Sequence, residues 1–105
     1  MKLIELVRDL DTLDERSTIY ASRPWSDTSE AIAACEPEAG GMPPEAERLN
    51  LKYFLEVFIA RNFIEDWTAN CNTQPTLQQK CARLIVYAVS DASFSAKSET
   101  SEARQ

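Results

Sequence analysis

The sequence predicts one α+β domain, in which a small, mostly antiparallel sheet of about three strands is packed by helices on one face. Three observations indicate this fold. The 105 residues suffice for one hydrophobic core and not for two. Hydrophobic residues make up 44% of the chain and charged residues 27%, which is a globular balance. Short β-branched and aromatic segments stand between amphipathic segments, and the last of these is long enough to anchor the sheet as a long C-terminal helix.

The first third of the chain predicts a helix followed by a β-hairpin. A first apolar stripe has helical spacing, and the turn-rich residues 11–15 end that helix. Residues 17–21, STIYA, predict a strand, and residues 31–35, AIAAC, predict a second strand that pairs back on it. The apolar stripe consists of Leu3, Leu6, Val7 and Leu10.

The middle of the chain predicts a loop, a short helix, a central strand and another helix. Residues 36–44 hold both glycines and three of the five prolines, which indicates a loop, and Pro44 begins a short helix to Leu49. Residues 51–60 predict a central strand, because as a helix their apolar positions would require burial on every side. A helix from Asn62 to Ala69 follows, with Phe63, Ile64 and Trp67 facing the core.

The last segment has the clearest helical pattern. Pro75 and Thr76 are typical of a helix start, and the apolar arc behind them packs on the sheet. This arc consists of Leu77, Cys81, Leu84, Ile85, Ala88 and Val89. The domain therefore spans residues 1–94, and the polar residues 95–105 predict a loose tail.

Composition excludes several classes of function. The chain has no histidine, which removes histidine-based triads and general bases and leaves no pattern for a catalytic zinc site. Cys35, Cys71 and Cys81 form no CxxC pair and predict free thiols in a reducing compartment. The sequence contains no run of 18 apolar residues, so it predicts no membrane span. Residues 1–11 lack the pattern of a signal peptide. We expect a cytoplasmic protein with no metal or cofactor.

The acidic charge is unevenly placed. The formal net charge is −6, and residues 1–50 hold 11 acidic residues against 5 basic ones, while residues 51–105 hold 6 of each. Such a surface repels nucleic acid and anionic lipid and attracts basic proteins, although solubility alone is the simpler interpretation. The candidate partner-binding residues are Asp9, Asp11, Asp14, Glu15, Trp25, Asp27, Glu36 and Glu38.

Trp25 is the candidate anchor of this surface. It follows Pro24 in a polar connection, and an aromatic side chain among acidic ones is typical of an interface hot spot. The alternative is that Trp25 folds back against the edge of the core.

An enzyme would need convergent carboxylates. The acids of the second half of the chain outside the tail are Glu56, Glu65, Asp66 and Asp91, and catalysis would require Glu56, Asp66 and Asp91 to meet in one deep pocket. Glu56 lies within an apolar segment, so it needs either a partner, such as Arg61 or Lys52, or an exposed face.

Several stretches resemble small bacterial immunity proteins encoded beside polymorphic toxins, including those of contact-dependent growth inhibition. They are residues 19–21 (IYA), 24–26 (PWS), 53–58 (YFLEVF) and 83–92 (RLIVYAVSDA). The resemblance implies a cytoplasmic inhibitor, without cofactor, that binds a toxin domain and blocks its active site. A basic nuclease toxin would suit the acidic surface. The class has no shared binding motif, so the resemblance assigns no residue.

Two further interpretations stay open. A small adaptor or anti-defence protein that binds another host or phage protein would have the same sequence features. Exposed aromatic residues on a short sheet could also form a homodimer.

Overall fold

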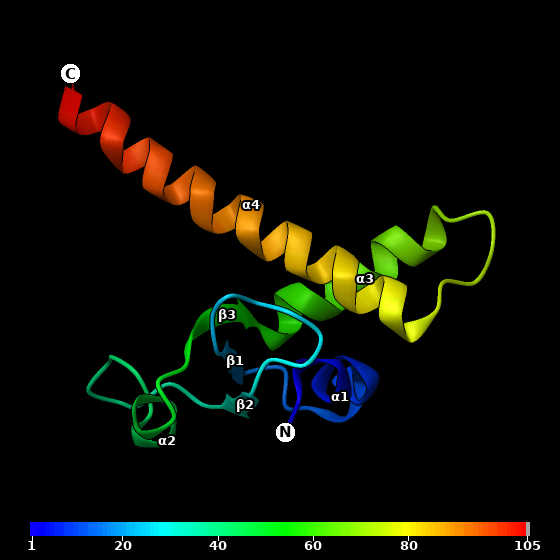
Figure 1. Ribbon diagram of the computed structural model, residues 1–105, viewed down its shortest axis with the longest axis horizontal. Helices are drawn as coiled ribbons and strands as arrows, with labels where there is room; N and C mark the ends of the chain where they lie inside the picture. The colour runs from blue at the N-terminus through cyan, green and yellow to red at the C-terminus, as the bar shows by residue number, and fades with distance from the viewer. Residues whose placement is uncertain (105) are drawn as a thin grey trace.

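The computed structural model confirms the α+β fold. It places the backbone of residues 1–104 and the side chains of residues 1–91. A three-stranded antiparallel sheet is combined with helices, one of them at the C-terminus (Figure 1). The elements in chain order are α1 (Leu3–Arg8), the 3-10 helix η1 (Leu10–Thr12), β1 (Thr18–Ala21), β2 (Ala31–Ala34), α2 (Pro44–Arg48), β3 (Lys52–Glu56), α3 (Val57–Ala69) and α4 (Leu77–Arg104).

The sheet has the order β2-β1-β3, so β1 is its central strand. The prediction that residues 51–60 form the central strand is wrong in position, because β3 lies at an edge. Ile19 pairs with Leu55, and Tyr20 pairs with Tyr53, so Phe54 is an extra residue in β3 that forms a β-bulge. The bulge lets both Phe54 and Leu55 reach the core.

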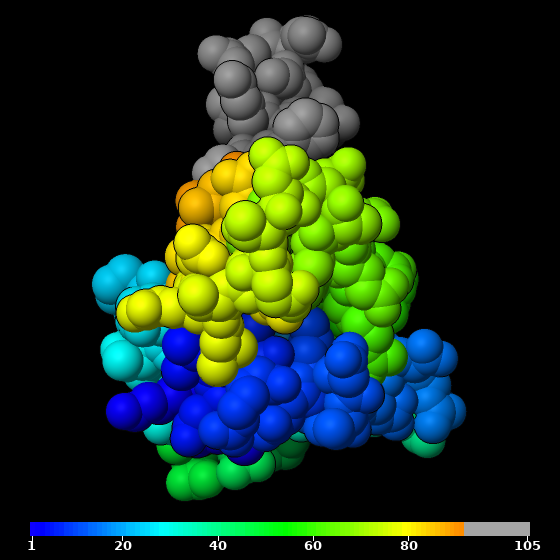
Figure 2. Space-filling view, turned by 90° about the vertical axis from the view of Figure 1, so that its right-hand side faces the viewer, coloured from blue at the N-terminus to red at the C-terminus, as the bar shows by residue number. Residues whose placement is uncertain are grey.

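Strand β1 is buried along its whole length and separates two apolar clusters. Ile19 and Ala21 belong to the main core, which also contains residues of α1, α3 and α4. Tyr20 points to the other face, where it packs with Ala46 and Leu51 around α2. The large helices therefore lie on one face of the sheet, as predicted, and α2 covers part of the other face. Figure 2 shows α1 (blue) packed beneath the layer formed by α3 and the start of α4.

The boundary between β3 and α3 differs from the prediction. The strand ends at Glu56 and the helix begins at Val57, whereas the sequence predicts a strand to residue 60 and a helix from Asn62. The amide of Val57 donates a hydrogen bond of 2.9 Å to the carbonyl of Ser17, and the Val57 side chain is fully buried. This strand-to-helix junction leaves no room for a loop.

Helix α4 begins as predicted, with reciprocal bonds between Thr76 and Gln79 at its first turn. Within its apolar arc, three side chains are fully buried, but Val89 is 48% exposed, so its predicted burial is wrong. Trp67 in α3 is only half-buried, although the sequence predicts it in the core. The backbone of 95–104 continues α4, and the tail's side chains lie outside the described residues, so the loose tail stays a prediction. The buried residues of the arc are Cys81, Leu84 and Ala88.

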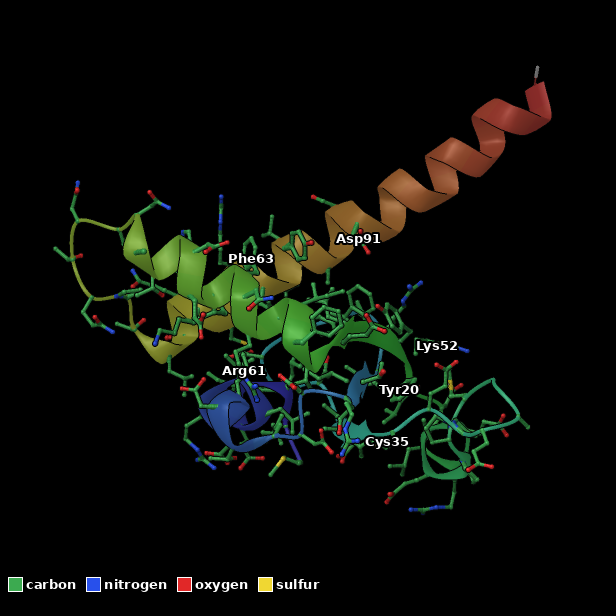
Figure 3. All side chains as sticks on the ribbon, turned by 180° about the vertical axis from the view of Figure 1, so that it is seen from behind. Tyr20, Cys35, Lys52, Arg61, Phe63 and Asp91 are labelled. Carbon is green, nitrogen blue, oxygen red and sulfur yellow. The ribbon has the colours of Figure 1, made fainter. Side chains whose placement is uncertain are left out.

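Arg61 ties α3 to the segment that precedes β1. Its Nη2 donates hydrogen bonds to the carbonyl oxygens of Leu10, at 3.0 Å, and Leu13, at 2.6 Å. Its Nε lies 4.0 Å from the carboxylate of Asp11. Figure 3 shows the Arg61 side chain extending from α3 towards this segment. The Leu10 carbonyl also accepts a hydrogen bond of 3.3 Å from the amide of Leu13, so the guanidinium adds a second donor there and satisfies the Leu13 carbonyl beyond the end of η1.

Replacing Arg61 should therefore destabilise the fold. Arg61→Met keeps the aliphatic stem but removes both hydrogen bonds, and we expect it to lower the free energy of unfolding by about 1.5–3 kcal/mol. Urea unfolding followed by circular dichroism measures this change. Arg48→Met is the control, because Arg48 pairs only with the exposed Glu45 and should change stability by less than about 0.5 kcal/mol. Equal losses in the two variants would contradict the role of Arg61.

The three thiols should differ in reactivity. Cys35 is exposed, Cys71 is half-buried, and Cys81 is fully buried, which raises the pKa of its thiol to about 11. At pH 8, a chromogenic disulfide reagent should modify Cys35 first and Cys81 only after unfolding. Equal labelling rates for all three native thiols would refute this order.

Because the pKa of Cys81 is raised in the folded state, its contribution to stability should be lost as pH rises from about 9 towards 11.

Candidate functional site

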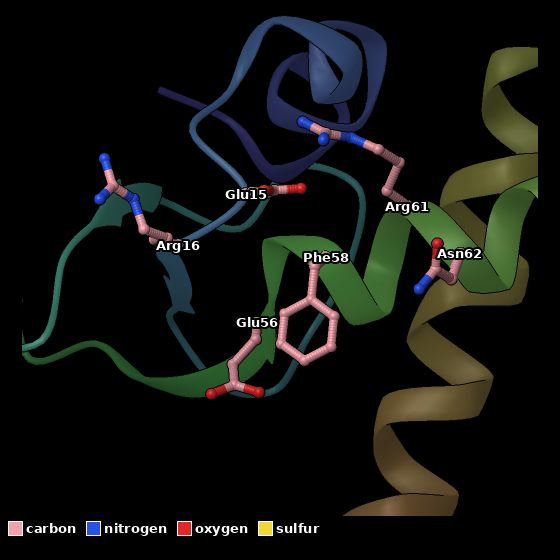
Figure 4. Close-up of a pocket in the computed structure, with 6 residues that line it drawn as sticks. All are labelled: Glu15, Arg16, Glu56, Phe58, Arg61 and Asn62. Carbon is pink, nitrogen blue, oxygen red and sulfur yellow. The ribbon is translucent and has the colours of Figure 1, made fainter.

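The candidate site is a shallow groove centred on Glu56. One hollow of ≈490 Å³ is shown in Figure 4, and a second hollow of ≈290 Å³ lies beside the outer face of the sheet. Glu56 is the one lining residue that the two hollows share. We call their combined lining the Glu56 groove. It consists of Glu15, Arg16, Thr18, Tyr20, Glu36, Gly41, Met42, Tyr53, Glu56, Phe58, Arg61 and Asn62.

Three neighbouring residues form the middle of this groove. Tyr53 lies opposite Tyr20 in the β3–β1 pairing and is 44% exposed. Glu56 is the last residue of β3, and Phe58, in the first turn of α3, is 46% exposed. In Figure 4 the side chains of Glu56 and Phe58 lie next to each other and point away from Arg61. The strand-to-helix junction thus presents a carboxylate beside two accessible aromatic rings.

The tyrosines of the groove report its local charge. Burial raises the pKa of Tyr20, and the negative charges of Glu36 and Glu56 raise it further. Burial likewise raises the pKa of Tyr53, followed by the charges of Glu56 and Asp91. Since its charge acts on both phenols, Glu56 lies near each of them. The groove therefore disfavours additional negative charge and favours a cation.

The expected partner for Glu56 is not present among the described side chains. Glu56 forms no ion pair there with Arg61 or Lys52. Arg61 is bonded to the Leu10 and Leu13 carbonyls, and Lys52 lies at the other end of β3. Glu56 is instead half-buried and lines both hollows, which is closer to the exposed face that the sequence left open as the alternative.

Several of the predicted acidic residues lie beside a cation. Arg8 makes two hydrogen bonds of 3.0 Å to the carboxylate of Asp9 and thereby lowers the pKa of that carboxyl. Hydrogen bonds from the backbone and side chain of Arg16 lower the pKa of Asp14. With Asp11 at 4.0 Å from Arg61, the end of α1 is a surface of alternating charges. Its negative charge is largely compensated.

The remaining predicted acidic residues separate into two groups. Glu15 lines the first hollow and Glu36 the second, so each lies in the Glu56 groove beside Glu56. Glu38 is exposed in the loop that follows β2, and Asp27 is half-buried near Cys81, whose thiol pKa it helps to raise. Among the described side chains, none of these four carboxylates forms an ion pair.

Trp25 packs against the core edge, as in the alternative interpretation. Its ring meets that of Phe54 edge to face, with centroids 4.9 Å apart and planes at 86°. Its Nε1 donates a hydrogen bond of 3.2 Å to the carbonyl of Ala21, and the guanidinium of Arg23 lies 4.7 Å from the ring centroid. Trp25 is half-buried and follows the end of β1 opposite to Glu15. One side of the Trp25 ring therefore packs against the domain.

The carboxylates considered for catalysis do not share one hollow. Glu56 lies in the groove, and Asp66 is exposed on α3. Asp91 lines another hollow with Arg23 and Lys52, which shares Tyr53 with the groove but not Glu56. Within residues 1–91, no group of three histidine, cysteine, aspartate or glutamate side chains is placed to hold a metal ion. These positions give no convergent acid–base pair.

Sequence reasoning missed Phe58 as a surface residue, whereas it predicts Tyr53 at the boundary between core and surface, where the structure has it 44% exposed. A signal for Phe58 exists, because it shares helical spacing with the polar Asn62, Glu65 and Asp66. An aromatic residue on an otherwise polar stripe is exposed if the helix begins at Val57. Because residues 51–60 were predicted as a strand, this helical stripe was not recognised.

Comparisons with known proteins assign no family. Neither the protein-family models, nor the curated proteins, nor the solved structures contain a match to this chain. Among the described residues, no helix is both long and apolar enough to cross a membrane. The class that the fold and groove define is a small α+β domain with an acidic, aromatic surface.

The packing of Trp25 can be tested by truncation. Trp25→Ala removes its contact with Phe54 and the hydrogen bond to Ala21, and we expect a loss of about 2–3 kcal/mol in unfolding free energy, below the ~3–5 kcal/mol of a fully buried tryptophan. Tyr53→Ala is the control, because its ring is accessible and should cost less. Urea unfolding measures both variants. An unchanged urea midpoint for Trp25→Ala would show that the ring does not stabilise the fold, and would leave it as a candidate anchor for a partner.

Proposed function

We propose that this chain is a non-enzymatic inhibitor that binds another protein, and specifically an immunity protein that neutralises a basic toxin domain of the nuclease type in the bacterial cytoplasm. The observation that carries the proposal is the Glu56 groove. It combines carboxylates that have no ion-pair partner among the described side chains with two accessible aromatic rings.

Aromatic side chains supply much of the binding energy at protein interfaces, and charge complementarity raises the rate of association. A nuclease domain must itself carry basic residues to bind phosphates. An acidic inhibitor can occupy the same surface and exclude the nucleic acid. The resemblance of residues 53–58 and 83–92 to immunity proteins agrees with this proposal.

The first test is capture of the partner. The tagged protein is recovered from its native cells and eluted with rising salt, and we expect one stoichiometric basic protein that leaves only at high salt or in denaturant. Expressing that protein alone should arrest growth, and expressing it together with this chain should restore growth. Recovery of no basic partner, or of one whose expression leaves growth unchanged, would refute the proposal.

A further inference from the structure

The exposed rings of the Glu56 groove are an unusual surface feature of the described chain. Phe58 lines the first hollow and Tyr53 the second, each together with Glu56, and close to half of each residue's surface is accessible. Two of the large hydrophobic residues that are exposed therefore lie within one groove. Such rings present apolar area that is favourable to cover, and their faces attract cations.

The charge around these rings is also one-sided. Glu15 precedes β1, Glu36 follows β2, and Glu56 ends β3, so three separate segments bring carboxylates to the groove. The two arginines of the lining are engaged elsewhere: Arg16 is paired with Asp14, and Arg61 binds the carbonyls of Leu10 and Leu13. Because Arg16 also interacts with the charge of Glu15, the carboxylates of the groove that no lining cation compensates among the described side chains are Glu36 and Glu56.

We propose that the Glu56 groove is the docking surface for a basic segment of the protein partner, which it recognises through an arginine side chain. The guanidinium lies over the ring of Phe58 or Tyr53 and donates hydrogen bonds to the carboxylate of Glu56. Glu15 and Glu36 attract the flanking basic residues. This inference rests on the proposed function and names the surface and the partner chemistry through which it would operate.

Arginine suits this groove better than lysine. Its guanidinium is planar, so it can stack on an aromatic ring while its edge donates two hydrogen bonds to one carboxylate. Lysine can supply the charge but not the stacked plane. The groove should therefore distinguish two peptides of equal charge, which attraction to a negative surface alone would not do.

The probe for this surface is the peptide acetyl-Arg-Arg-Arg-amide, titrated into the isotopically labelled full chain and followed by amide chemical shifts. The shifts should concentrate at Thr18, Tyr20, Tyr53, Glu56 and Phe58, and the affinity should fall with salt. The trilysine peptide should bind more weakly. Shifts centred on α1, or spread evenly over all acidic residues, would overturn the proposal.

Matched variants separate recognition from general charge. Glu56→Gln should weaken binding of the triarginine peptide by about tenfold, which corresponds to the loss of one charge-assisted contact. Glu65→Gln removes the same charge from the exposed surface of α3, outside the groove, and should have a much smaller effect. Phe58→Ala should weaken binding, whereas Val86→Ala, at an apolar residue of α4 that is slightly more exposed, should not. Equal effects within either pair would refute the groove.

Thermal unfolding of each variant shows whether the fold is retained. If Phe58→Ala does not fold, Phe58→Leu removes the π face but keeps an apolar side chain of similar length and gives the same test. The captured partner then distinguishes the two proposals. A partner that is retained equally by the chain and by its Glu56→Gln variant refutes the groove but leaves the inhibitor proposal standing. Absence of any basic partner refutes the inhibitor proposal, whatever the peptide does.

Discussion

The direct passage from β3 into α3 is the constraint on which the rest of the structure depends. Val57 is the first residue of the helix, its side chain is fully buried, and its amide bonds to the carbonyl of Ser17 at the start of the central strand. With no loop between the two elements, the direction of α3 is set by the sheet itself. Every side chain that follows Val57 then has a defined position relative to β1.

This junction gives three nearby side chains three different environments. Glu56 precedes it and faces the groove, Phe58 follows it and stays accessible, and Arg61 lies one helical turn beyond Val57 and reaches the segment before β1. The hydrogen bonds of Arg61 hold that segment, and Glu15, two residues after Leu13, lines the same hollow as Glu56. The hydrogen bonds of Arg61 and the Glu56 groove therefore both depend on the strand-to-helix junction. A change at Arg61 would alter the groove as well as the stability.

Most elements were predictable because their signals are local. The first helix, the hairpin strands, the short helix at Pro44 and the start of α4 each carry their own spacing or end residues, and the structure contains them all. The end of β3 was not predictable in this way. Residues 51–60 are apolar at both the strand and the helix period, and β-branched Val57 and Ile59 favour a strand. The point at which the strand ends and the helix begins depends on a hydrogen bond to Ser17 and on the bulge at Phe54, both of which require a partner strand.

The same distinction applies to the candidate site. A list of acidic residues cannot show which charges are compensated, because that depends on where distant cations lie. Asp9 and Arg8 are neighbours in sequence, so their pairing could have been anticipated, but Asp11 meets Arg61 only in the folded chain. Glu15, Glu36 and Glu56 come from three segments and become neighbours of one groove only when the sheet forms. An acidic surface becomes selective where its carboxylates lack cations of their own and stand beside accessible aromatic rings, because a partner must then supply both the charge and the apolar contact.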